Sequence, residues 1–583
     1  MHYKISYNNP HEQFIDVEYT VDTKKRKLIN IQLPSWRPGR YELGNFAKNV
    51  RCFVAFDEAG NVLKNKKISK DCWEISPEES KSITVKYQYY AAELNAGSTF
   101  LNHQQIYVNP VNCCMYDVEN IDAELMLDLV VPNTYTLANS LNVIEEKETE
   151  DFHKIINLTA KNFHELADSP FIASPTIKRE YFVIDGIEFN LWFQGECRPV
   201  FSKLISDFFI FINEQLTIFK SIETEVFHFM FQIVPYQFYH GVEHVNSTVI
   251  VLGPSYNLMK KEVYDELLGV SCHELFHHWN IKTIRPKEML PYDYTKENYS
   301  TLGYVCEGVT TYYGDYVLYR SGVFSDDDYF NCFNVQLKKH CDNFGRFNYS
   351  LAESSFDTWL DGYNKGVPDR KVSIYTEGCI VAFITDINIR KHTKNQKCLD
   401  DVVRTLYNDY GKQNKGYTDK DYINIVNTTA NADLNWIFNN HVYDSKIVIE
   451  PLKEALYYLG LELSIMPVKN IYEAVLGFKA VLESGKYVVS NIYPNSECEK
   501  KGLMLNDKIV SINGYEIKQD LNEWITYYSD DDISMEVINS GQLRQIICRN
   551  SKSIYYKNYA VIKQFDATAE QKENFKNWSG RYF

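Results

Sequence analysis

The stretch His273-Glu274-Leu275-Phe276-His277 lies within a segment of helical pattern, Glu262 to Lys282. Residues four positions apart share one face of an α-helix, so both imidazoles can bind the same Zn²⁺ ion. Glu274 lies at the edge of that face, where its carboxylate can accept a proton from a metal-bound water without being a ligand. The alternative is a surface helix that carries the pattern by chance. The helical setting favours the zinc site.

A catalytic zinc needs a third protein ligand and one open position. The candidate is Glu307, in a second segment of helical pattern. It follows His277 by 30 positions, which leaves room for a loop and a return helix. Spacing alone leaves this assignment open, because acidic residues are plentiful. His278 points about 100° away from His277 on a helix, so we expect it to pack or to support the ligands.

The order of strand and helix patterns predicts a multidomain α+β protein. Alternating runs such as Phe14 to Val21 and Ser82 to Tyr90 indicate an all-β N-terminal domain, of sandwich type. Strands followed by a helical half indicate an α+β domain next, and a strand-rich unit with glycine-bounded turns follows it. The expected boundaries are residues 1–168, 169–455 and 456–556, with a polar tail over 557–583.

Composition restricts the partners. Of the 583 residues, 45% are hydrophobic and 24% are charged, as in folded soluble proteins. Lys and Arg number 61 against 77 Asp and Glu, a net charge of −16. Nucleic acid is therefore not expected as a partner, because phosphate binding needs a basic surface. No run approaches the roughly 18 apolar residues of a membrane span, so no membrane partner is expected either.

Cysteine usage and the N-terminus indicate a compartment. The 13 Cys are scattered, without any CxxC pair, and are expected to be reduced thiols. Met1-His2-Tyr3-Lys4-Ile5 does not begin a signal-peptide apolar region. These features predict a cytoplasmic protein.

Several separated motifs together resemble one family. They are His273 to Asn280, Arg285-Pro286 with Tyr294 to Tyr299, Glu307-Gly308-Val309-Thr310-Thr311-Tyr312-Tyr313, and Pro34-Ser35-Trp36-Arg37-Pro38-Gly39-Arg40-Tyr41. The chain resembles the glycyl aminopeptidase family of zinc metallopeptidases, whose members carry a PDZ domain near the C-terminus. The resemblance implies a thermolysin-like catalytic domain over residues 169–455, with one Zn²⁺ per chain held by His273, His277 and Glu307. The segment Pro34 to Tyr41 is similar to a signature of the family's N-terminal β domain.

Two further segments are similar to family motifs that bear on substrate. His240-Gly241-Val242-Glu243-His244 is similar to a Gly-Gly-x-Glu-His segment, whose Glu would bind the free α-amino group of the substrate. The resemblance thus implies Glu243, Gly241 and His244 as substrate-binding residues, with His240 departing from the pattern. The alternative is an ordinary strand or loop that carries a glutamate.

The other segment is Ser373-Ile374-Tyr375-Thr376-Glu377-Gly378, similar to a Ser-Tyr-Tyr-x-Lys-Gly segment. It implies that Tyr375 donates a hydrogen bond to the oxyanion formed during catalysis. The alternative is an ordinary buried tyrosine. Ile374 and Glu377 depart from the pattern, and Glu377 reverses a charge.

The C-terminal unit resembles a PDZ domain. Leu476-Gly477-Phe478 would be its carboxylate-binding loop, with backbone N–H groups facing the C-terminal carboxylate of a peptide. The segment Gly502 to Gly514 matches the turn and strand that PDZ domains share. Two alternatives remain open: the groove binds a C-terminal peptide, or the unit packs against the catalytic domain.

The sequence therefore predicts a zinc-dependent aminopeptidase that acts on peptides with a free N-terminus and prefers small N-terminal residues, Gly or Ala. Glu274 would be the general base and Tyr375 would assist at the oxyanion. One alternative is a zinc endopeptidase of thermolysin type, which needs no free N-terminus. The other is a PDZ-centred binding or scaffold protein with a weakened active site.

Overall fold

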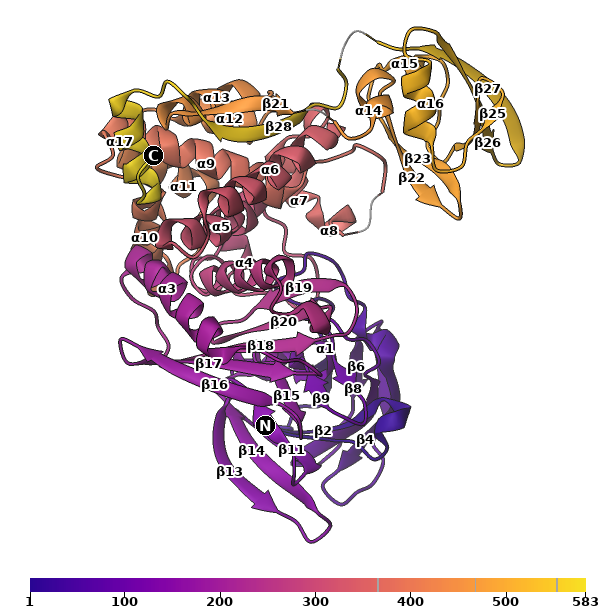
Figure 1. Cartoon of the computed structure of the whole chain (residues 1–583). Helices are drawn as coiled ribbons and strands as arrows, with labels where there is room; N and C mark the ends of the chain where they lie inside the picture. The colour runs from indigo at the N-terminus through magenta and orange to yellow at the C-terminus, as the bar shows by residue number, and fades with distance from the viewer. Residues whose placement is uncertain (364–365, 467, 552–553) are drawn as a thin grey trace.

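The computed structural model describes residues 1–583 except 364–365, 467 and 552–553 (Figure 1). A β domain lies at the bottom of the view, a mixed domain with a helical half lies above it, and a smaller unit lies at the upper right. Among the described residues, none of the helices combines the length and apolar character that crossing a bilayer requires.

The N-terminal β domain is built from sheets over residues 2–174, all of which are described. In β2 (Phe14–Asp22), buried side chains alternate with half-buried ones, as an antiparallel strand with one covered face requires. The largest sheet contains, in spatial order, β13 (Asn142–Glu148), β14 (His153–Ala160), β11 (Leu125–Pro132), β1 (His2–Ser6), β2, β7 (Ser82–Tyr90) and β4 (Val50–Asp57). The smaller sheets contain β10 (Tyr116–Asp117), β3 (Ile29–Gln32), β6 (Cys72–Ile75) and β5 (Asn65–Ser69), and β12 (Thr136–Ala138), β15 (Phe171–Ser174), β9 (Ile106–Val108) and β8 (Phe100–Leu101).

The second domain begins with a mixed sheet. Its strands lie in the order β16 (Lys178–Ile184), β17 (Ile187–Gln194), β18 (Val226–Ile233), β20 (Ser247–Gly253) and β19 (Phe238–Glu243). Strands β17, β18 and β20 run parallel, whereas β19 returns antiparallel to β20 at the edge of the sheet. Helix α4 (Lys261–His277) contacts both β19 and β20. The edge strand and α4 therefore form two walls of the same region.

The helical half packs around α9 (Ile374–Thr393), which is buried along most of its length. A π-helical turn, Tyr304–Val309, continues directly into α5 (Thr310–Ser321) and contacts α9. The remaining helices of this half are α3 (Phe201–Phe219), α6 (Asp326–Asp342), α7 (Leu351–Phe356), α8 (Thr358–Asp361), α10 (Leu399–Asp409), α11 (Asp419–Ala430), α12 (Asn435–His441) and α13 (Ile449–Tyr458). The largest hydrophobic core among the described residues joins this half to the mixed sheet.

The C-terminal unit is inserted between two paired strands. Strands β21 (Leu461–Met466) and β28 (Asn558–Lys563) pair antiparallel beside α6 (Figure 1). Between them lies a separate sheet with its own core. Its elements are α14 (Ile471–Val475), β22 (Phe478–Glu483), β23 (Lys486–Ile492), α15 (Glu497–Lys500), β24 (Lys508–Ile512), β25 (Tyr515–Glu516), α16 (Leu521–Tyr527), β26 (Asp532–Asn539) and β27 (Gln542–Arg549).

The last residues, expected as a polar tail with a possible helix over Lys572 to Trp578, contain a docked helix. After β28, helix α17 (Ala569–Ser579) packs on the helical half, and Trp578 is 1% exposed. The Trp578 indole N–H donates to the hydroxyl of Tyr312, and the hydroxyl of Tyr316 donates to the Trp578 carbonyl. The segment is polar on average, but Phe575 and Trp578 lie three positions apart and share a buried helical face.

The C-terminal unit docks on the end of α6. Lys479, at the start of β22, forms an ion pair with Asp342, and the Asn491 side chain donates to the Asp342 carbonyl at 3.3 Å. Next to them the rings of Tyr493 and Phe344 meet edge to face, 4.8 Å apart. The unit is therefore held at the helical half by charge, hydrogen bonding and aromatic packing together.

Candidate active site

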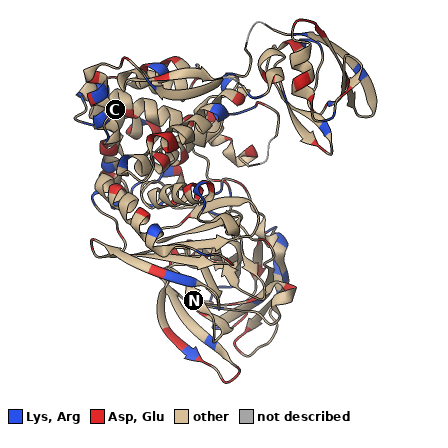
Figure 2. Ribbon diagram, in the orientation of Figure 1, with Lys and Arg blue, Asp and Glu red and all other residues tan. Residues whose placement is uncertain are grey.

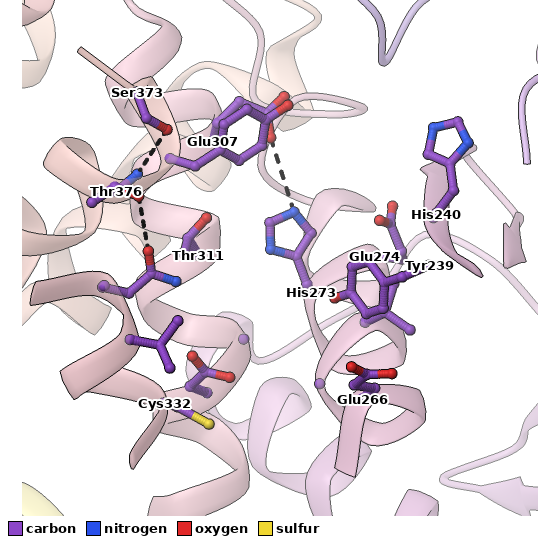
Figure 3. Close-up of a pocket in the computed structure, with 18 of the residues that line it drawn as sticks. Tyr239, His240, Glu266, His273, Glu274, Glu307, Thr311, Cys332, Ser373 and Thr376 are labelled. Atoms are coloured by element: carbon purple, nitrogen blue, oxygen red, sulfur yellow. Dashed lines mark hydrogen bonds and ion pairs between the residues drawn. The ribbon is translucent and has the colours of Figure 1, made fainter. Parts of the chain in front are cut away.

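A cavity of about 1220 Å³ opens between β19, α4, α5, α6 and the start of α9. Residues Gly39 and Arg40 of the N-terminal domain also line it. Figure 3 shows the side chains of His273, Glu274 and Glu307 facing this space. The two segments that the sequence singled out thus meet in one cavity.

The side chains of His273, His277 and Glu307 converge. The two Nε2 atoms lie 3.0 Å apart, and Glu307 Oε2 lies 3.4 Å from His277 Nε2 and 3.9 Å from His273 Nε2. Ligands at about 2.05 Å from a tetrahedral zinc would lie about 3.3 Å from one another. The observed spacings bracket that value, so two imidazole nitrogens and a carboxylate oxygen fit a zinc ion.

Neighbouring groups orient these ligands. His277 Nδ1 lies 2.9 Å from the carbonyl oxygen of Asn280, which fixes the N–H on Nδ1 and leaves the Nε2 lone pair for a metal. The Asn280 amide donates to the carbonyls of Val305 and Cys306, at 2.8 and 3.2 Å. Asn280 therefore joins the end of α4 to the turn that carries Glu307.

The backbone around Glu307 is a π-helical turn within an otherwise α-helical element. Such turns are rare and occur frequently at functional sites. The irregular turn leads directly into α5. The direction of the Glu307 side chain therefore does not follow the 3.6-residue spacing of that helix. Sequence periodicity predicts a helix here but cannot show this irregularity.

Glu274 lines the same cavity and is 5% exposed. Burial raises its pKa to about 8; Glu243 and Glu307 raise it too, whereas His277 and Arg37 oppose the rise. A carboxyl group in this setting takes up a proton readily, as a general base must. Gly241 on β19 packs against it so closely that any side chain there would collide with the Glu274 carboxylate.

Glu243 ends β19 and lies beside the proposed metal ligands. Carboxylate oxygens of Glu243 and Glu274 and a ring nitrogen of His277 lie within 4.8 Å of one another. Glu243 is 4% exposed, and its Oε1 has no hydrogen-bond partner among the described residues. A buried carboxylate oxygen without a partner is costly, so this atom suits a cationic ligand.

The neighbours of Glu243 have other contacts. His244 turns to Asp168, with Nδ1 3.2 Å from Oδ1, instead of lining the cavity as the resemblance implied. His240 lines the cavity, and its Nδ1 accepts a hydrogen bond from the N–H of Ala96 at 3.3 Å. Burial, with Arg37 and Arg40 nearby, lowers the pKa of His240 to about 3, so the ring is neutral.

Tyr375 begins α9 and lines the cavity. Its pKa is raised well above the usual value by burial, then by Glu307 and Tyr363, so the hydroxyl stays protonated and hydrogen-bonds to Tyr363. The charge reversal at Glu377 has a local explanation. Both Glu377 oxygens lie 2.8 Å from His340 Nδ1, so this carboxylate has its partner within the helical half.

No sequence motif indicated a role in the site for Tyr41, Gly39 or Arg37. The Tyr41 hydroxyl donates to Glu307 Oε1 at 2.9 Å. A Cβ on Gly39 would lie 2.5 Å from Glu243 Oε2, and Gly39 has a φ of +81°, so only glycine fits there. The Arg37 guanidinium is buried near Glu243. All three lie in Pro34 to Tyr41, which the sequence identified only as a domain signature.

Acidic groups dominate the cavity. Asp and Glu residues are frequent along the helices of the helical half (Figure 2), and several of them line the cavity. Among the described lining residues only Arg40 and Lys339 are basic, whereas the acidic ones are Glu243, Glu262, Asp265, Glu266, Glu274, Glu307, Asp315 and Glu377. A cavity lined mainly by negatively charged side chains attracts positively charged ligands.

Leu476, Gly477 and Phe478 lie in the C-terminal unit. The N–H groups of Leu476 and Gly477 both donate to the carbonyl of Tyr472, at 3.1 Å, where they close the end of α14. Gly477 has a φ of +77°, and Phe478 starts the edge strand β22. Two of the three N–H groups expected to face a peptide carboxylate are therefore used within the unit, because a short helix precedes the loop.

Two imidazoles and a carboxylate that fit a metal, with a free carboxylate beside them in an open cavity, form the site of a zinc metallopeptidase. Residues 2–175 match the Peptidase M61 N-terminal domain, and residues 266–381 match the M61 glycyl aminopeptidase. The chain thus matches two domain models of the M61 peptidase family, and it is a zinc metallopeptidase of the aminopeptidase class.

The chain is also similar in fold to solved structures. An aminopeptidase N family protein from Idiomarina loihiensis has a TM-score of 0.89 at 24% identity, with 99% of each chain covered. An M1 zinc metallopeptidase from Deinococcus radiodurans has a TM-score of 0.49 at 13% identity, over 76% of this chain and 94% of that one. No curated protein matches the chain. The first similarity extends over the whole fold, including the C-terminal unit.

Proposed function

We propose that the protein removes the N-terminal residue from peptides, with His273, His277 and Glu307 holding one zinc ion. The observation that carries the proposal is the unpartnered Oε1 of Glu243, buried in the cavity beside Glu274 and His277. A carboxylate about one residue from the ligands can bind a substrate's α-ammonium group and place its first peptide bond at the metal. The acidic cavity supports the same charge preference.

Each of these residues has a separate role in the proposed hydrolysis. Bound zinc would polarise the scissile carbonyl and lower the pKa of a coordinated water. Glu274 accepts the proton from the attacking water and passes it to the leaving amine. Tyr375 donates its hydroxyl hydrogen bond to the developing oxyanion. The free edge of β19 offers backbone groups to an extended peptide, in the manner of an added strand.

We attribute the proposed preference for Gly or Ala to the groups around Glu243. Gly39 approaches the carboxylate from one side, and the neutral His240 ring is held in the cavity wall by Ala96. A substrate whose amine reaches Glu243 must place its first side chain beside these groups. Large side chains would have to displace the loop of the N-terminal domain, whereas small ones would not.

A comparison of free and blocked substrates tests the proposal. Glu243→Gln should reduce kcat/KM for a free-amine glycyl substrate about 10- to 150-fold, the worth of one charged hydrogen bond. Hydrolysis of the N-acetylated counterpart should stay low and unchanged. If the variant loses both activities equally, Glu243 does not bind the amine. Efficient cleavage of blocked peptides by the unmodified protein would favour the endopeptidase alternative.

We further propose that the C-terminal unit is a PDZ domain whose main role here is docking. The use of the Leu476 and Gly477 N–H groups by α14, and the Lys479–Asp342 ion pair, favour packing over peptide capture. Peptides with free hydrophobic C-termini should then show no binding by fluorescence anisotropy up to about 0.1 mM, well weaker than the micromolar scale of specific complexes. Micromolar binding would contradict this role.

A cytoplasmic location belongs to the same proposal. All 13 cysteines lie in the described ranges, and each is a free thiol. Reduced thiols in such number are typical of a reducing compartment. Detection of the protein in a cytosolic fraction is the expected result, with exposed Cys52 reactive to alkylation in the folded protein and the buried thiols reactive only after unfolding. A disulfide-linked, secreted protein would contradict it.

A further inference from the structure

Tyr41, a residue of the N-terminal β domain, contacts the proposed zinc ligand Glu307. The Tyr41 hydroxyl donates to Glu307 Oε1 at 2.9 Å, although the two residues lie 266 positions apart in sequence. Tyr41 is 5% exposed and Glu307 is 3% exposed, so water does not compete freely for this hydrogen bond. We propose that Tyr41 is a positioning residue that holds Glu307 in a one-oxygen binding mode toward zinc.

The two oxygens of Glu307 face different partners. Oε2 points toward the imidazoles, 3.4 Å from His277 Nε2, whereas Oε1 accepts the hydrogen bond from Tyr41. A carboxylate with both oxygens free can turn and bind a metal through both. With one oxygen held by Tyr41, Glu307 supplies a single ligand atom, and the position for the attacking water stays open.

Tyr41 itself is held in place by contacts across the domain boundary. Its backbone N–H donates to the Tyr363 hydroxyl at 3.3 Å, and its ring meets that of Trp359 edge to face at 6.0 Å. Upstream in the same segment, the Trp36 indole donates to the Asp293 carbonyl at 2.7 Å, and the Ser35 N–H donates to the Tyr294 carbonyl at 2.7 Å. The phenol is therefore preorganised before any metal binds.

These contacts join the segment Pro34 to Tyr41 to the connector segment around Tyr294. Pro34 to Tyr41 of the first domain docks on the connector around Tyr294, and the end of the docked segment supports the metal ligand. The first domain thus completes the metal site in addition to covering the cavity. Partners behind metal ligands typically change metal affinity 10- to 100-fold when removed.

The test measures zinc affinity and rests on the proposed zinc site. In chelator competition, Tyr41→Phe should bind zinc 10- to 100-fold more weakly than the unmodified protein, while the zinc-free melting temperature stays within about 2 °C. Tyr375→Phe removes another cavity phenol and should lose activity but keep zinc affinity. Equal zinc affinity of Tyr41→Phe and the unmodified protein would overturn the inference.

A double-mutant cycle distinguishes loss of the Tyr41–Glu307 hydrogen bond from a general disturbance of the fold. In a Glu307→Ala background, Tyr41→Phe should cause no further loss of zinc affinity, because its acceptor is absent. An equal loss in both backgrounds would show a general disturbance of the fold and would overturn the inference. If the unmodified protein binds no zinc, the proposed function fails first, so the two failures are distinguishable.

Discussion

Gly308, next to the proposed ligand Glu307, packs directly against Gly378, three residues after Tyr375. A Cβ on Gly378 would lie 2.7 Å from the Gly308 Cα and 2.9 Å from the Tyr304 carbonyl oxygen, both backbone atoms that cannot move aside alone. The π-helical turn and α9 therefore cross without an intervening side chain. This crossing fixes how the helix start that carries Tyr375 lies relative to Glu307.

Substitution at the crossing should loosen the site. Gly378→Ala should lower the free energy of unfolding by about 1–3 kcal/mol, as overpacking does, and should weaken zinc binding because the Glu307 turn must shift. Urea unfolding and chelator competition measure the two effects. In contrast, Gly269→Ala in α4 has only one atom near its Cβ, at 3.9 Å, and should leave stability unchanged or raise it. Equal behaviour of the two variants would contradict the argument.

Glu274→Gln separates catalysis from metal binding. The amide cannot accept the proton of the attacking water, so kcat should fall at least about 10²- to 10⁴-fold. Zinc content should stay unchanged, because Glu274 is not among the three proposed ligands. Steady-state kinetics and metal analysis of the same preparation give both values. A fully active variant would remove Glu274 from the role of base.

A buried ion pair behind Glu243 predicts a pH effect on stability. Asp168 Oδ1 lies 2.6 Å from Lys282 Nζ and also contacts His244. Burial alone would raise the pKa of Asp168, but Lys282 and His244 outweigh it, and the net shift is downward. A carboxyl whose pKa is depressed by folding stabilises the fold above its unfolded pKa of about 3.9 and loses that effect as the pH falls through its folded pKa.

Asp168→Asn should therefore cost about 3–5 kcal/mol at pH 7, because it leaves Lys282 buried without its counter-charge. The difference from the unmodified protein should shrink as the pH falls below about 4. Urea unfolding between pH 7 and pH 3 measures this difference. A difference that stays constant over the whole range would show that the Asp168 charge does not stabilise the fold.

The C-terminal helix should be part of the folding unit. Trp578→Ala should lower the free energy of unfolding by about 3–5 kcal/mol, because it empties a buried aromatic site on the helical half. Phe565→Ala is the matched control, since Phe565 is fully exposed and its removal should change stability by less than about 0.5 kcal/mol. Thermal unfolding measures the stability of the two variants and of the unmodified protein. Equal stabilities would mean that α17 does not support the fold.

The sequence predicted the helical segments that carry the proposed ligands His273 and His277, because helices depend on local periodicity. Residues i and i+4 of one helix must share a face, and the structure places His273 and His277 with their Nε2 atoms 3.0 Å apart. Peptidase class also follows from these motifs and is confirmed by the family matches. The β character of the first domain followed from strand alternation.

The contacts between domains could not be predicted in this way. Tyr41 reaches Glu307 across 266 positions, and no periodicity relates residues so far apart. Leu476 and Gly477 were expected in a carboxylate-binding loop, but their N–H groups close α14, a five-residue helix too short to leave a clear pattern. The last 27 residues were expected to be a polar tail with a possible helix over Lys572 to Trp578, but their average polarity hides the small buried face by which α17 docks.

The most direct test of the account locates zinc in the protein. Metal analysis of the purified protein, with anomalous diffraction at the zinc edge, should show one zinc per chain between His273, His277 and Glu307. Removal of zinc with a chelator should abolish hydrolysis of a free-amine glycyl substrate, and added zinc should restore it. Less than half a zinc per chain, with no hydrolysis when zinc is supplied, would contradict the account.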